Sequence, residues 1–64
     1  MSNSEFAICY LKAVEKNYKA YFEKSRLSIL NCVIIKGTEI ISVHINQDLP
    51  FEIKHDIEMM FWVD

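Results

Sequence analysis

Apolar residues recur at helical spacing in the first third of the chain. They advance by three or four positions at a time, at Ala7, Leu11, Val14, Tyr18 and Phe22. Lysines and glutamates occupy the opposite arc, where Glu15 and Lys19 have the favourable i, i+4 order of charges. A single apolar stripe with this period predicts an amphipathic helix over about residues 4–24.

The middle of the chain is rich in Ile, Val and Leu and contains the only glycine, Gly37. Residues 27–36 and 39–46 are therefore predicted as two strands. Gly37-Thr38 suits a two-residue type II′ turn, because glycine takes the position that needs a positive φ. This turn pairs Cys32 with Val43 and predicts one apolar face for the core. A register slip of two residues would leave each side chain on its face. The predicted core face consists of Leu30, Cys32, Ile34, Ile41, Val43 and Ile45.

The last fifteen residues, 50–64, are predicted as a helix that is apolar on two opposite sides. At about 100° of rotation per residue, they form two stripes half a turn apart. One stripe is assigned to the core, and the other is the candidate partner-binding site, because exposed Trp, Phe and Met together are typical of a contact surface. The alternatives are that this second stripe is buried between the hairpin and the first helix, or that it is buried in a homodimer. The core stripe is Ile53, Ile57, Met60 and Phe61, and the partner-binding stripe is Phe51, His55, Met59 and Trp62.

These elements predict a small α+β fold in the order α-β-β-α, with residues 1–64 as a single domain. An antiparallel β-hairpin packs with the N-terminal amphipathic helix and a short C-terminal helix. A chain of 64 residues is close to the size at which one core suffices for stability. A lone hairpin also leaves both strand edges open. We therefore expect a homodimer in which hairpins pair edge to edge or exposed faces meet.

The single Gly and single Pro exclude the loops on which several enzyme classes depend. Phosphate-binding loops need several glycines so that the backbone can approach the ligand. The sequence contains no dinucleotide-binding fingerprint, no P-loop and no nucleophile elbow. We expect neither an enzyme nor a cofactor.

The two cysteines and two histidines do not have the spacing of a zinc site. Structural zinc sites use pairs of ligands a few residues apart, and no such pair of cysteines or histidines is present. Cysteine catalysis needs a base beside the thiol, and the pattern brings neither His44 nor His55 close to Cys9 or Cys32. No metal ligand and no catalytic residue is predicted, and Cys32 is expected to be buried.

The net charge of −2 is unevenly distributed. Residues 1–27 have a net charge of +2, and residues 28–64 have a net charge of −4. Lys12, Lys16 and Lys19 lie along one side of the first predicted helix and are the candidate contacts for the alternative function, nucleic-acid binding. The acidic balance and the absence of an arginine cluster weaken that alternative.

The predicted location is cytoplasmic, without membrane association. Two widely separated cysteines are typical of reduced thiols. No apolar run approaches the length of a membrane span, and no basic segment precedes the short apolar run at the N-terminus.

The function predicted from the sequence is that of a small non-enzymatic protein-binding protein, of the inhibitor or adaptor type. It would act through the hydrophobic and aromatic surface of the C-terminal helix, as a homodimer with a further protein partner. The alternative is a small nucleic-acid-binding regulator that uses the lysines of the first helix.

Overall fold

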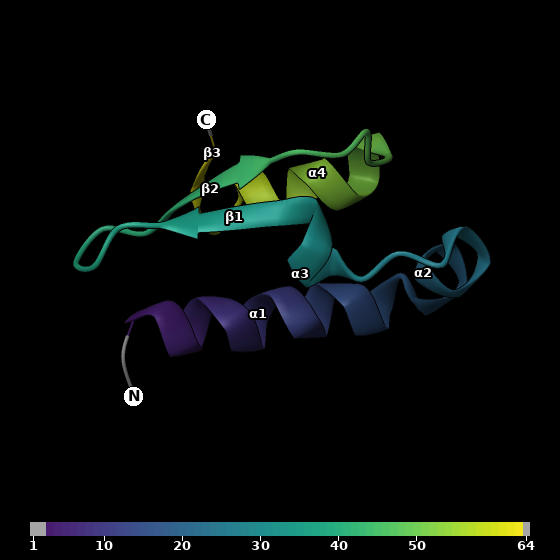
Figure 1. Ribbon diagram of the computed structural model, residues 1–64, viewed down its shortest axis with the longest axis horizontal. Helices are drawn as coiled ribbons and strands as arrows, with labels where there is room; N and C mark the ends of the chain where they lie inside the picture. Colours follow the sequence, from purple (N-terminus) through teal and green to yellow (C-terminus); the bar gives the residue numbers. More distant parts are fainter. Residues whose placement is uncertain (1–2, 64) are drawn as a thin grey trace.

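The computed structural model describes residues 3–63, which form four helices and a three-stranded sheet (Figure 1). The N-terminal long helix, the sheet built on a β-hairpin and the C-terminal helix confirm the predicted α+β class. In chain order the elements are α1 (Asn3–Asn17), α2 (Lys19–Ser25), α3 (Ile29–Cys32), β1 (Val33–Lys36), β2 (Ser42–Ile45), α4 (Phe51–Glu58) and β3 (Trp62–Val63).

The predicted helix over residues 4–24 is interrupted at Tyr18, so its continuity was wrong. Tyr18 has φ −115° and ψ 36°, outside the helical range, and α2 starts in a new direction after it (Figure 1). The bend lets the Tyr18 hydroxyl donate to Asp56 Oδ2 at 2.8 Å, while Phe22 of α2 is buried. The apolar spacing continues through the bend, which is why periodicity alone did not reveal it.

The first half of the predicted strand 27–36 is instead the short helix α3. The Ile29 N–H donates to Glu15 Oε2 of α1 at 2.8 Å, which satisfies an amide at the start of α3. The side chain of Ser28, the N-cap residue, makes no capping bond. A carboxylate fourteen residues earlier in the chain therefore replaces a local cap.

The hairpin register differs from the prediction by an odd number of residues. Val43 pairs with Ile35, three positions along the chain from the predicted partner Cys32. An odd shift exchanges the two faces of a strand. Val33 and Ile35 therefore share the core face with Val43, while Ile34 is exposed, so the predicted face assignment for this strand was wrong.

The register changes because residues 37–41 form a longer loop in place of the predicted two-residue turn. Gly37 does take a positive φ of 97°, and a Cβ there would collide with the Ile40 carbonyl oxygen. The Asn3 side chain of α1 donates to the carbonyl oxygens of Thr38, at 3.1 Å, and Glu39, at 2.9 Å. The start of α1 thus holds the loop in place.

The predicted helix over residues 50–64 ends at Glu58, and the chain then returns to the sheet. Pro50 is the N-cap residue of α4. After a turn, β3 pairs parallel to β2, with Trp62 opposite Ser42 and Val63 opposite Val43. Asp64, which was expected in the last helical turn, lies outside the described residues.

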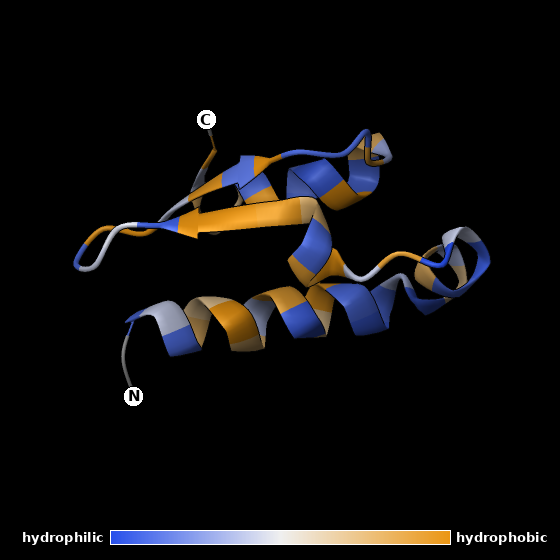
Figure 2. Cartoon of the chain, viewed as in Figure 1, coloured by the Kyte–Doolittle hydropathy of each residue, from blue (hydrophilic) through white to orange (hydrophobic). Residues whose placement is uncertain are grey.

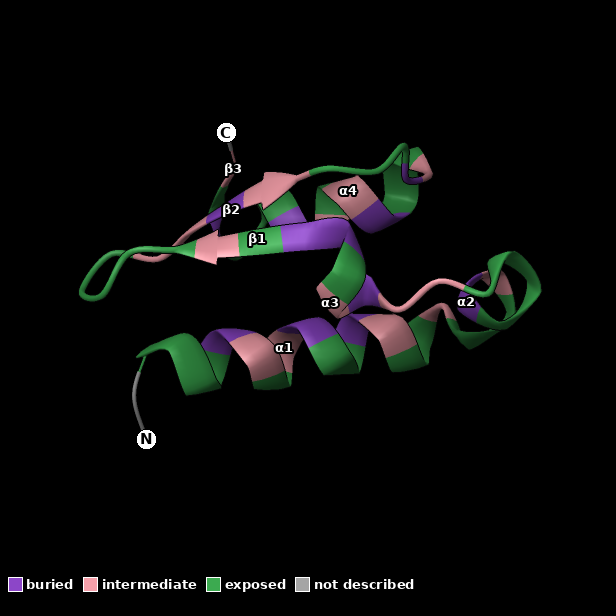
Figure 3. Ribbon diagram, in the orientation of Figure 1, coloured by how far each residue is buried: buried purple, intermediate pink, exposed green. Residues whose placement is uncertain are grey.

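The core lies between α1, α4 and the inner face of the sheet (Figure 3). Hydropathy follows the same division, with β1 almost wholly apolar and polar residues along the outer side of α1 (Figure 2). The Tyr10 ring meets the Phe61 ring edge-on, with centroids 5.4 Å apart. None of the described helices is long and apolar enough to cross a membrane. The buried residues are Ala7, Leu11, Val14, Phe22, Ile29, Cys32, Val33, Val43, Leu49, Ile53, Ile57 and Phe61.

Replacing Glu15 with alanine should destabilise the protein, because the Ile29 N–H loses its acceptor. Loss of a helix cap costs about 0.5–2 kcal/mol. The matched control is Glu23→Ala, which removes an exposed carboxylate 3.6 Å from Lys19 Nζ. Such surface pairs contribute about 0.2–1 kcal/mol. In urea unfolding followed by circular dichroism, Glu15→Ala should have a lower midpoint concentration of urea than the control. Equal midpoints would contradict the capping role.

The two thiols should differ sharply in reactivity. Cys9 is exposed, whereas Cys32 is fully buried, and burial together with the charge of Glu15 raises the pKa of its thiol. A disulfide reagent at neutral pH should modify Cys9 quickly and Cys32 only when denaturant is added, because the thiolate is the reactive form. Rapid modification of both thiols in the native protein would contradict the placement of Cys32.

The raised pKa of Cys32 also predicts a pH dependence. Above the ordinary thiol pKa the unfolded state ionises first, so stability should fall as the pH rises through the alkaline range. The loss of thermal stability between neutral and alkaline pH should be smaller in Cys32→Ala than in the wild type, whereas Cys9→Ala should show the same loss as the wild type.

Candidate protein-interaction surface

Three of the four predicted partner-binding residues lie on the outward face of α4 and its C-terminal end. Phe51 is 76% exposed and Met59 72% exposed, and His55 lies exposed between them. The rings of Phe51 and His55 stack at 5.8 Å with an interplanar angle of 15°. Ile53 and Ile57 are buried on the opposite side of the helix. We call Phe51, His55 and Met59 the α4 stripe.

Trp62 was predicted on the same helix face but lies on β3 and is 74% exposed. Because residues paired in a sheet project to the same side, Trp62 shares the outer sheet face with Ser42. Trp62 and Met59, which belongs to the α4 stripe, line the same shallow hollow of about 240 Å³. Trp62 therefore lies at one end of the stripe because β3 pairs with β2, and the sequence did not predict this pairing.

Met60, which was assigned to the core, is 46% exposed, because the helix ends before it. It lines a second hollow, of about 300 Å³, to which Trp62 also contributes. Phe6, 52% exposed, and Ile40, 73% exposed, also line this hollow. The exposure of Phe6 could have been inferred from the sequence, because Phe6 lies about 100° around the helix from Ala7, which belongs to the buried stripe. That of Ile40 could not, since its position depends on the length of the loop.

The α4 stripe owes its outward orientation to contacts on the other side of the helix. The Tyr10 hydroxyl donates to the Asp56 carbonyl oxygen at 2.9 Å, and the Tyr18 hydroxyl donates to the Asp56 carboxylate. The bond to Asp56 is the largest of the effects that raise the pKa of Tyr18, followed by desolvation and by the negative charges of Asp56 and Glu52. These two bonds fix which face of α4 is directed towards α1.

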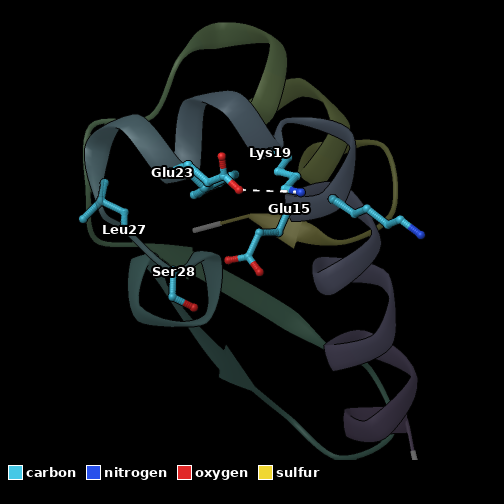
Figure 4. Close-up of a pocket in the computed structure, with 7 residues that line it drawn as sticks. Glu15, Lys19, Glu23, Leu27 and Ser28 are labelled. Atoms are coloured by element: carbon cyan, nitrogen blue, oxygen red, sulfur yellow. Dashed lines mark ion pairs between the residues drawn. The ribbon is translucent and has the colours of Figure 1, made fainter.

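The three lysines of the alternative function are not gathered on one helix. Lys12 and Lys16 are exposed on α1, whereas Lys19 begins α2 after the bend. Lys19 Nζ lies 3.6 Å from Glu23 Oε1. A groove of about 440 Å³ near the bend is lined by Lys16 and Lys19 but also by Glu15 and Glu23 (Figure 4). Carboxylates so close to the lysines reduce the positive potential that phosphate binding requires.

Within residues 3–63, no group of three or more His, Cys, Asp or Glu side chains is placed to hold a metal ion. The raised pKa of Cys32 disfavours the thiolate that a nucleophile or a metal ligand requires.

Comparison of the chain with models of protein families, with curated proteins and with solved structures found no match.

Proposed function

We propose that the protein is a small non-enzymatic protein-binding protein, of the inhibitor or adaptor type, that acts through the α4 stripe and Trp62. The observation that carries this proposal is the exposure of Phe51, Met59 and Trp62, each more than 70% exposed, with Met59 and Trp62 lining the same hollow at the end of α4. Burying a large apolar side chain contributes about 1.5–3 kcal/mol, so a partner covering all three would gain substantial binding energy. Tryptophan is also among the residues most enriched at binding hot spots.

Capture from native lysate tests this proposal. The wild-type chain should retain a partner, and Trp62→Ala and Phe51→Ala should each weaken its retention about tenfold or more, as hot-spot truncations do. Lys24→Ala is the control, because Lys24 is exposed on α2 and lines neither of the hollows beside Trp62. Retention unchanged by both aromatic substitutions would contradict a role for this surface.

We also propose that the chain is a homodimer joined through β1. β1 lies at the end of the strand order, so one of its edges has no neighbouring strand in the sheet. The Asn46 N–H donates to the Cys32 oxygen at 2.9 Å. In an antiparallel ladder, the residues whose backbone groups face the neighbouring strand alternate with residues that face away. Val33 and Ile35 therefore direct their backbone groups to the outer edge, and the exposed Ile34 lies between them.

Sedimentation equilibrium at micromolar concentration should show a dimer. Ile34→Lys should dissociate it, because charged residues on an edge strand oppose pairing between chains. The control, Ile40→Lys, adds the same charge to the loop and should leave the dimer intact. A wild-type mass that stays near 7.6 kDa would contradict the dimer without bearing on the α4 stripe.

A further inference from the structure

Two carboxylates border the α4 stripe on opposite sides. On a helix with about 100° per residue, Glu58 lies about 20° beyond Phe51, and Glu52 lies about 20° beyond Met59. Met59 still has helical φ and ψ values of −67° and −22°, so the same geometry extends to it. Glu52 is at the N-terminal end of α4 and Glu58 at the C-terminal end, both exposed. The stripe is thus an apolar strip with negative charge at two diagonal corners.

The nearby basic residues do not neutralise these carboxylates. Lys54 is the only lysine on α4, and its Nζ lies 3.9 Å from Asp48 Oδ1. Neither the Glu52 carboxylate nor the Glu58 carboxylate forms a hydrogen bond or an ion pair with a residue in the described range 3–63. The surrounding sequence, residues 28–64, has a net charge of −4. Both carboxylates are therefore available to a partner.

Building on the proposed function, we infer that the α4 stripe binds a basic amphipathic segment of another protein. Apolar side chains of that segment would cover Phe51 and Met59, and Lys or Arg side chains on its flanks would meet Glu52 and Glu58. A cation beside the strip can also lie over the face of Phe51 or Trp62, which attracts positive charge. An acidic segment of equal hydrophobicity would place like charges together, and this discriminates against it.

A second copy of the chain fits this surface less well. Two α4 stripes facing each other would bring the carboxylates of Glu52 and Glu58 from both copies into one interface. The lysines of α1 in a second copy could meet those carboxylates. The exposed residue beside Lys12 and Lys16 is Ala13, however, which is too small to cover Phe51 and Met59. Charge complementarity therefore favours a different, basic partner.

The test uses two fluorescein-labelled synthetic peptides with identical leucines on one helical face. One carries lysines on both flanks of that face, and the other carries glutamates at the same positions. Fluorescence anisotropy gives the Kd of each peptide for the full chain at low and at moderate salt. We expect the lysine peptide to bind with a salt-dependent Kd and the glutamate peptide to bind at least tenfold more weakly.

Protein variants locate the charges. Glu52→Gln/Glu58→Gln should weaken binding of the lysine peptide about fivefold, the size expected for two exposed ion pairs. Glu23→Gln/Glu39→Gln makes the same change in net charge at exposed positions away from the stripe and should change the Kd less than twofold. Binding of the lysine peptide should also shield Trp62 from water and shift its fluorescence emission to shorter wavelength. Met59→Ala should weaken the binding and reduce this shift.

Equal losses for the two double variants would overturn the inference, because binding would then follow net charge and not position. Equal Kd values for the two peptides would also overturn it. If a lysate partner is lost on changing Trp62 but is retained at full affinity by Glu52→Gln/Glu58→Gln, the inference fails while the proposed function stands.

Discussion

The attachment of α1 to the later segments is the constraint on which the rest of the structure depends. β1 and β2 have four residues each and β3 has two, so the sheet alone buries little apolar area. α1 supplies the missing cover with Ala7, Leu11 and Val14. Polar contacts along the same helix then fix its position: Asn3 to the hairpin loop, Tyr10 to Asp56, and Glu15 to Ile29. Each contact joins α1 to a different part of the chain, so one helix orients the hairpin, α3 and α4 together.

This arrangement explains why the apolar surface is where it is. A helix with apolar residues on two sides can bury only one of them against a two-layer core. Asp56 is held by two tyrosines of the N-terminal segment, and Ile53 and Ile57 are buried beside it. Among the described residues 3–63, no further element covers the opposite side, where Phe51 and Met59 lie.

The sequence was sufficient to predict the features that depend on periodicity within a single segment. The apolar stripe of α1 and the burial of Ile53 and Ile57 were read correctly, because a helix repeats its environment every 3.6 residues or so. Prediction failed where a distant residue decides the local structure. Glu15 provides the acceptor for Ile29, so an apolar run rich in β-branched residues begins as a helix. Asn3 holds the hairpin loop, and the length of that loop sets the strand register.

The candidate surface was predictable to the same extent. Phe51, His55 and Met59 follow from helical spacing, and their outward placement agrees with it. Trp62 was assigned to a helix because the apolar pattern of residues 59–63 fits helix and strand equally, a known ambiguity of short apolar runs. Only the neighbouring β2 decides the matter, by offering Ser42 and Val43 as partners. Phe6 of α1 and Ile40 of the hairpin loop line a hollow beside Trp62, and the position of Ile40 depends on the length of the loop, which no local pattern describes.

The parallel pairing of β3 has a consequence for cooperativity. A strand of only two residues at the edge of a sheet belongs to the least stable part of a domain, the part that opens by local unfolding at a small cost in free energy. Phe61 precedes it and packs against Tyr10, so release of β3 also loosens a contact with α1. A molecule that binds Trp62 only in the paired state would shift this opening equilibrium towards closure. Binding at Trp62 would then be coupled, through β3, to the contact between Phe61 and Tyr10 in the core.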